Sequence, residues 1–244
     1  MAGIYEQIIN QLFKVKLEKY DRKIYHIGMK EIGRDEAIQY LSRYLYALIQ
    51  NTIDDVAQQE NGVEKCIQFT NDVIRELGEK FAIENYEDDL VDASNSILTS
   101  VIDKTKCDYP DLQKYIQRIT PLTSLTKSRL FTGAKNSVNM ISELKKEILS
   151  ADEIYIVVSF IRLSGLNMML PELQEFVARG GSLKVITTTY MQISEYKAIE
   201  KLSKLAHTEI KISYHSDLDR LHAKAYVFMR DSGFHTAYIG SSNI

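Results

Sequence analysis

"RLHAKAYVFMRDSGFHTAYIGSSNI", residues 220–244, has the pattern of a β-hairpin. In the arm "LHAKAYVF" (221–228), the two-residue period of a strand places His222 and Lys224 on the same face. "DSGF" supplies the turn, and "HTAYIGSSN" is the return arm. The return arm ends on Gly240, Ser241, Ser242 and Asn243. The hairpin therefore joins an imidazole and an ammonium group at one end of the segment to a glycine-serine-asparagine corner at the other.

Strands and helices alternate in the residues before this hairpin. The apolar, β-branched run "EIYIVVSF" (153–160) predicts a strand buried on both faces. "SGLNMMLPELQEFVARGG" (164–181) predicts a helix that stops at its two glycines. Strand "SLKVITTTY" (182–190), helix "SEYKAIEKLSKLA" (194–206) and strand "EIKISY" (209–214) follow. This order predicts an α/β domain whose sheet is at least partly parallel.

The first half of the chain has the period of helices instead. Apolar residues recur at three- and four-residue steps in 34–56 and 63–81, and more weakly in 88–105. "TPLTSLTKS" (120–128) joins a proline to small hydroxyl residues and is the best linker candidate. We therefore expect an all-α N-terminal domain, residues 1–125, and an α/β domain, residues 126–244.

Composition limits the class of protein. The 244 residues are 45% hydrophobic, which is enough for one or two domains with a core of their own. Cys66 and Cys107 stand far apart and predict neither a disulfide framework nor a zinc site. The N-terminus has no signal-peptide pattern, and the longest apolar run is too short to span a bilayer. These features favour a cytoplasmic protein without a membrane partner.

Charge differs between the two halves. Residues 1–125 hold 15 Lys and Arg against 21 Asp and Glu, a balance of −6, whereas residues 126–244 hold 15 against 12, a balance of +3. Ordinary solvated surface explains such an asymmetry, and a phosphate-binding second domain explains it as well. The charge therefore permits a nucleic-acid partner and does not establish one.

The hairpin motif resembles the signature of the phospholipase D superfamily, which is H-x-K, four residues, Asp, six residues and G-[GS]-x-N. The matching residues are His222, Lys224, Gly240, Ser241 and Asn243. Two departures stand out, because the Asp position of the signature is Met229 here, with Asp231 two residues later, and the hairpin is longer than the standard spacing. The resemblance implies a phospholipase-D-like α/β domain with a mixed sheet.

A narrower resemblance rests on "SADEIYIVVSFI", "SGL", "TTTY" and the wording around the motif. These stretches look like the phospholipase-D-like domain at the N-terminus of bacterial superfamily 2 helicases, several of them linked with restriction or phage defence. The resemblance implies a helicase region in the same longer protein or complex, because the 244 residues contain no G-x-x-x-x-G-K-[ST] motif. We also expect the natural protein to continue beyond Ile244, because the last predicted strand would otherwise lack a following helix to cover it.

The superfamily implies hydrolysis of phosphodiesters, here most plausibly in DNA, without a metal or another cofactor. His222 would attack phosphorus and form a phosphohistidine, while Lys224 and Asn243 hold the non-bridging oxygens together with a serine hydroxyl of Ser241 or Ser242. The superfamily works with two H-x-K motifs about a two-fold axis. His26, His207, His215 and His235 are none of them followed two places on by lysine. The resemblance thus implies a homodimer or a higher assembly.

Other interpretations stay open. Ser159, Arg162 and Thr189 lie at or just after the ends of predicted strands, where an open α/β sheet places its ligands, yet each also fits an ordinary loop. Asp231 is a further candidate in place of the missing acidic residue. The whole domain could also be a degenerate module that binds nucleic acid or dimerises without turnover. A lipid phosphodiesterase would need an apolar rim or an amphipathic membrane helix, which the sequence does not offer.

Overall fold

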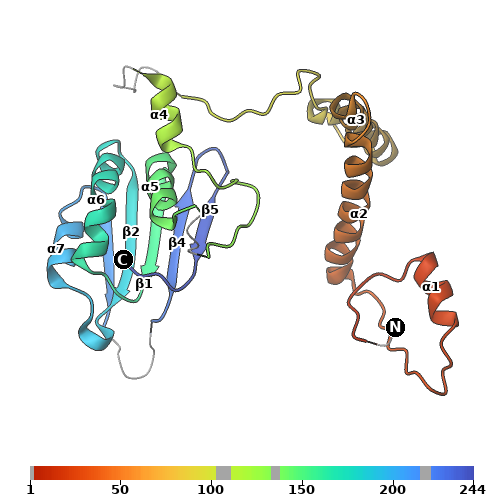
Figure 1. Ribbon diagram of the computed structural model, residues 1–244, viewed down its shortest axis with the longest axis horizontal. Helices are drawn as coiled ribbons and strands as arrows, with labels where there is room; N and C mark the ends of the chain where they lie inside the picture. Colours follow the sequence, from red (N-terminus) through yellow and green to blue (C-terminus); the bar gives the residue numbers. More distant parts are fainter. Residues whose placement is uncertain (1–2, 103–110, 133–137, 215–220) are drawn as a thin grey trace. The chain divides into compact units, whose positions relative to one another are not determined.

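The computed structural model describes residues 3–102, 111–132, 138–214 and 221–244. The chain divides into two compact units, Met1–Thr99 and Ser100–Ile244 (Figure 1). Within the described ranges, no helix is long and apolar enough to cross a membrane. Cys107 lies outside these ranges, and Cys66 is a free thiol.

The first unit is helical, as the sequence predicts. Its elements are α1 (Gln11–Glu18), α2 (Arg34–Ala57), α3 (Gly62–Phe81) and the 3-10 helix η1 (Tyr86–Asp89). α2 and α3 confirm the predicted helices. Gly62 is required at their turn, because a Cβ there would lie 2.2 Å from the backbone oxygen of Ala57.

The weak helix predicted at 88–105 is wrong for the residues described. η1 ends at Asp89, and no helix follows before residue 102. The Asn71 side chain accepts from the Val91 N–H at 2.8 Å and donates to the Val91 carbonyl at 3.0 Å. Both backbone groups of Val91 are thereby engaged outside a helix. The apolar residues that suggested the helix also find no core, since Ile97 is 87% exposed.

The second unit is the predicted α/β domain. Its helices are α4 (Leu112–Ile119), α5 (Met140–Ser150), α6 (Leu163–Ala178), η3 (Tyr190–Gln192) and α7 (Tyr196–Ser203). Its strands are β1 (Glu153–Val158), β2 (Ser182–Thr188), β3 (Thr208–Ser213), β4 (Lys224–Met229) and β5 (Thr236–Ile239). The strand order is β3-β2-β1-β4-β5. β1, β2 and β3 are parallel, whereas β4 runs antiparallel to β1 and β5. The sheet is therefore mixed, as expected.

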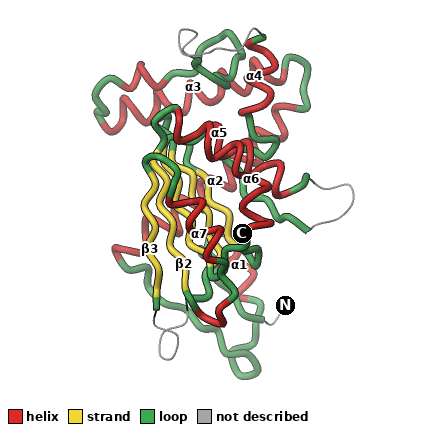
Figure 2. Tube along the Cα trace, turned by 90° about the vertical axis from the view of Figure 1, so that its left-hand side faces the viewer, coloured by secondary structure: helices red, strands yellow, loops and turns green. Residues whose placement is uncertain are grey.

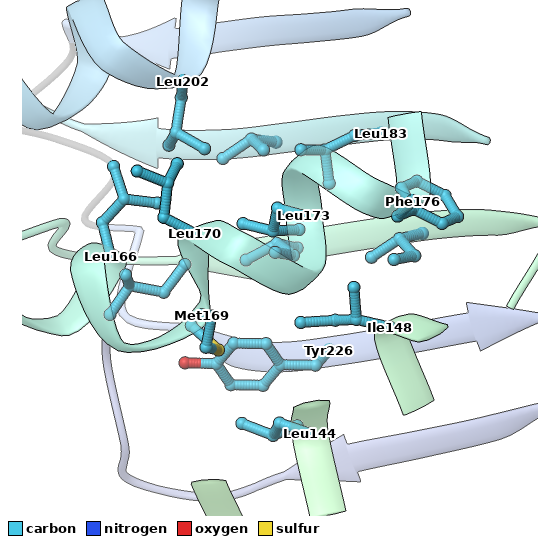
Figure 3. Packing of buried hydrophobic residues seen from close by; sticks show 14 of the residues in the cluster. Leu144, Ile148, Leu166, Met169, Leu170, Leu173, Phe176, Leu183, Leu202 and Tyr226 are labelled. Atoms are coloured by element: carbon cyan, nitrogen blue, oxygen red, sulfur yellow. The ribbon is translucent and has the colours of Figure 1, made fainter. Parts of the chain in front are cut away.

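The helices α5, α6 and α7 lie along one face of the sheet (Figure 2). Their buried side chains meet alternate residues of the strands (Figure 3). The labelled members of this core are Leu144, Ile148, Leu166, Met169, Leu170, Leu173, Phe176, Leu183, Leu202 and Tyr226. The expectation that β1 is buried on both faces is wrong, because its burial alternates and Tyr155 and Val157 are only partly covered. Among the described residues, one face of the sheet carries the core.

α4 packs with the second unit, although it precedes the linker predicted at 120–128. Arg118 donates to both carboxylate oxygens of Glu175 in α6, at 2.9 and 2.5 Å. Lys146 in α5 donates to the backbone oxygens of Gln117 and Thr120. These contacts place α4 beside α5 and α6. The domain boundary between residues 125 and 126 stays a prediction.

A buried polar network fixes the turn between β4 and β5. Arg230 is 7% exposed and forms an ion pair with Glu147 of α5, which is fully buried. Glu147 also accepts hydrogen bonds from Thr236 and Tyr238 of β5, at 2.7 and 2.8 Å. Arg230 donates to the backbone oxygen of Phe234 within the turn. The hairpin is thus held to α5 at the end of the sheet opposite to His222.

Candidate active site

One edge of the sheet, here called the polar edge, gathers the polar residues that the sequence singled out, apart from Asp231. The parallel strands β1, β2 and β3 end there, β4 begins there, and β5 ends there. The register pairs Val158 with Lys224, Thr188 with Ser213, and Ala225 with Ile239. This edge is where open α/β sheets bind their ligands.

Lys224 is the most unusual residue of this edge. It is 7% exposed, and its Nζ donates to the Ser159 Oγ at 3.3 Å and to the His222 backbone oxygen at 3.2 Å. No carboxylate forms an ion pair with it in the part of the chain that the structure describes. An ammonium group has three donors, so one N–H remains for a ligand. The position combines a positive charge, little water and a free donor.

Ser159 connects Lys224 to the end of β1. It is fully buried, and its hydroxyl donates to the Ala223 backbone oxygen at 3.3 Å while it accepts from Lys224. The Thr187 hydroxyl donates to the Ser159 backbone oxygen at 3.3 Å. Ser159 therefore positions the lysine from beneath and does not face solvent.

His222 lies just before β4, which begins at Lys224. The sequence pattern puts both His222 and Lys224 within a strand, whereas in the structure the strand begins at Lys224 and His222 lies before it. The side chain of His222 is exposed, whereas its carbonyl is held by the Lys224 ammonium. The imidazole is consequently accessible to a ligand bound over Lys224.

Asn243 comes to the same place from the end of the chain. Its Oδ1 accepts from the Phe160 N–H at 3.2 Å, which fixes the orientation of the amide and leaves the Nδ2 donors for a ligand. The residue before Asn243 is held by Tyr226, whose hydroxyl donates to the Ser242 backbone oxygen at 3.0 Å. Burial raises the pKa of Tyr226 to about 12, so this phenol keeps its proton near neutral pH.

The rest of the corner is open. Ser241 and Ser242 are exposed, and a Cβ at Gly240 would meet no atom within 4 Å. By contrast, Gly165 at the start of α6 is required, because a Cβ there would lie 2.4 Å from the backbone carbon of Ile244. The Arg162 N–H donates to the Ile244 backbone oxygen at 2.8 Å. The chain end is thereby seated against α6.

The remaining candidates divide between the two ends of the sheet. Arg162 is exposed at the start of α6, and Thr189 follows β2, so both lie at the edge that holds Lys224. Asp231 lies beyond the other end of β4, about 23 Å from Lys224 along the strand. Its backbone N–H donates to the Asp152 carboxylate. The structure does not bring Asp231 together with the other candidates.

The other histidines lie elsewhere. His207 immediately precedes β3, and the His235 Nδ1 accepts from the Arg230 N–H in the turn after β4. Both positions are at the end of the sheet opposite to His222. His26 belongs to the first unit, and His215 lies outside the described residues. Among the described histidines of the second unit, His222 is the one at the polar edge.

Three contributors escaped the sequence patterns. The backbone N–H of Phe160 has no sequence signal, and Thr187 is hidden within an ordinary strand. Tyr226 could have been found, because the two-residue period already puts it on the face of Lys224. In the described ranges, no group of three or more His, Cys, Asp or Glu side chains is arranged to hold a metal ion.

Comparison with known proteins gives one family match. Residues 136–244 match the family described as NgoFVII restriction endonuclease N-terminal PLD domain. No curated protein matches the chain. The match covers α5, the whole mixed sheet and the corner at Asn243, so it includes the strands and the corner that build the polar edge. The match is consistent with a phospholipase D superfamily domain in residues 136–244.

Proposed function

We propose that this protein is a phosphodiesterase, namely a metal-independent nuclease that acts on DNA in restriction or phage defence. The observation that carries the proposal is Lys224, an almost buried ammonium group with no carboxylate partner among the described residues. Burying an unpaired charge is costly, so such a site favours an anionic ligand. The matching family is named for a restriction endonuclease, and the phosphodiester group of DNA is the corresponding anion.

The proposed first step uses His222 as the nucleophile. A ring nitrogen of His222 attacks phosphorus, a phosphorus–nitrogen bond forms, and the bond to the leaving oxygen breaks. The Lys224 ammonium, the Asn243 Nδ2 and the hydroxyls of Ser241 and Ser242 hold the non-bridging oxygens, where negative charge develops. The contacts to Ser159 and Phe160 support these roles, because they orient the lysine and the amide before the substrate arrives.

The leaving oxygen needs a proton, and water must later be activated to cleave the phosphohistidine. His207 and His235, at the opposite end of the sheet, are too far from Lys224 to act there. We therefore propose that His222 of a second copy takes both roles in a two-fold dimer. Light scattering at concentrations that give robust cleavage should show a dimer or a larger assembly. A monomer under those conditions contradicts the pairing.

Cleavage of labelled DNA in excess chelator tests the mechanism. We expect cleavage to persist, because no step needs a cation, and to vanish in His222→Ala. His235→Ala is the matched control, since it removes a second exposed histidine of the same unit from the opposite end of the sheet. Chelator-sensitive cleavage that survives His222→Ala refutes the mechanism. Binding without cleavage under all conditions favours the degenerate module.

The biological setting is part of the same proposal. A restriction function is exercised on DNA inside the cell, which fits the cytoplasmic location inferred from the sequence. A helicase region, in the same longer protein or in a complex, would expose DNA strands to the polar edge. Co-purification of the tagged natural protein followed by an ATPase assay tests this association, and the absence of DNA-stimulated ATPase activity counts against it.

A further inference from the structure

Two tyrosines stand exposed at the edge of the sheet that carries the proposed active site. Tyr196 is 76% exposed at the start of α7, and Tyr214 is 72% exposed directly after β3. Large aromatic side chains are usually at least partly covered in a folded domain. Exposed aromatic rings beside an edge that is proposed to bind phosphate are suited to stack on a ligand with an apolar face.

A short chain of contacts joins Tyr196 to the site. Asn243 is bonded to the N–H of Phe160, and the next residue, Ile161, donates its N–H to the Ser194 hydroxyl at 3.3 Å. The Ile161 carbonyl in turn accepts from the Glu195 N–H at 2.8 Å. Tyr196 follows Glu195 directly, so its backbone is tied to the loop that orients the Asn243 amide.

Tyr214 is placed by the register of the sheet. Ser213 pairs with Thr188, and its carbonyl also accepts from the Thr189 N–H at 3.1 Å. β3 lies three strands from β4, so the strand that precedes Tyr214 and the strand that begins at Lys224 are about 14 Å apart across the sheet. This distance equals the length of about four stacked nucleotides at 3.4 Å each.

The loop between β2 and α7 is held in a costly shape. Met191 and Gln192 both have positive φ, at 57° and 54°, although neither is glycine. Consecutive non-glycine residues in this region are rare and concentrate at functional sites. The Ser194 hydroxyl, which donates to the Thr188 carbonyl at 3.1 Å, holds the loop against the end of β2. The loop therefore presents Tyr196 from a fixed backbone.

We infer that Tyr196 and Tyr214 form a stacking platform for unpaired bases, and that the proposed nuclease site thus takes a single-stranded segment of DNA. The inference rests on the proposed function, because it requires a phosphodiester at Lys224. Tyrosine rings stack on the face of any base, but in a duplex the neighbouring pairs cover those faces. Arg162, which is exposed at the start of α6, adds a positive charge for the DNA backbone at the same end of the sheet.

Binding of an oligonucleotide that carries 2-aminopurine, to the full chain with His222→Ala, tests the inference without cleavage. We expect Tyr196→Leu and Tyr214→Leu each to weaken binding of the single strand by about 5- to 150-fold. Binding of the matching duplex should change little. The conservative variants Tyr196→Phe and Tyr214→Phe should bind as the parent does, because they keep the ring.

Phe234→Leu is the matched control, since this exposed ring lies in the turn at the opposite end of the sheet. Leu variants that bind the single strand as tightly as the parent overturn the inference, and so does an equal loss on duplex. A change in oligomeric state without a change in binding would assign the tyrosines to the contact between copies instead. If His222-dependent cleavage persists while the Leu variants bind normally, the inference alone fails. If no cleavage occurs but the ring-dependent binding does, the proposed activity fails and the platform stands.

Discussion

Replacing Lys224 by methionine should raise or preserve stability while it abolishes most of the activity. The side chain is 7% exposed, and its ammonium group meets two neutral oxygens, those of Ser159 and His222. Methionine has nearly the same length and carries no charge. The substitution removes two hydrogen bonds of about 1 kcal/mol each, and it also removes the larger cost of burying an unpaired charge.

Lys224→Met should have different effects on stability and on cleavage. Ser159 keeps its own hydrogen bond to the Ala223 carbonyl, so Lys224→Met leaves its hydroxyl with a partner. We expect the free energy of unfolding to stay level or to rise by about 1 kcal/mol, which corresponds to about 3 °C in Tm. Loss of a charge-assisted contact of about 1.5–3 kcal/mol should lower the rate of cleavage about 10- to 150-fold.

Thermal unfolding with and without inorganic phosphate measures both effects. Phosphate at about ten times its Kd should stabilise the parent by about 1.4 kcal/mol, and it should not shift Lys224→Met. Lys204→Met is the control, because Lys204 is exposed and its ion pair with Glu200, at 3.0 Å, contributes little. If Lys224→Met lowers the free energy of unfolding by more than about 2 kcal/mol, Lys224 supports the fold and the reasoning is refuted.

Three further predictions concern the hairpin. Burial raises the pKa of Tyr226 to about 12, so its contribution to stability is complete below pH 10 and is lost as pH rises from about 10 to 12; alkaline unfolding of Tyr226→Phe should show a shallower pH dependence. Gly240→Ala should have the same Tm as the parent, because the added Cβ meets no atom within 4 Å, and a lower Tm would contradict this. Reduced cleavage at an unchanged Tm would mean that the substrate occupies the space beside Gly240. Arg230→Met should cost about 3–5 kcal/mol of unfolding free energy in chemical denaturation, since it strands the buried Glu147, and the added change Glu147→Leu should recover much of it; no recovery would show that packing dominates.

The sequence by itself determined the five strands, the helices α2, α3, α6 and α7, and the order of these elements. Local periodicity is a property of neighbouring residues, so α2, α3, the five strands and the α/β class could all be predicted from it. The weak stripe at 88–105 failed because Asn71, far away in the chain, captures the backbone of Val91. α5 has no counterpart among the predicted elements. Two of its residues on the buried side are the charged residues Glu143 and Glu147, so the helix lacks a plain apolar stripe. Buried carboxylates look like surface residues until their partners are known.

Only the tertiary structure decided how the polar edge is made. The motif spacing named Lys224 and Asn243, but their partners Ser159 and Phe160 stand 65 and 83 residues away in the chain. No local pattern encodes such contacts, because they depend on which strands become neighbours. The order β3-β2-β1-β4-β5 puts β4 beside β1, which buries Lys224 next to Ser159 and carries Asp231 to the opposite end. The strand order therefore decides that Lys224 is buried without a charged partner, and the packing of the whole core sets the strand order.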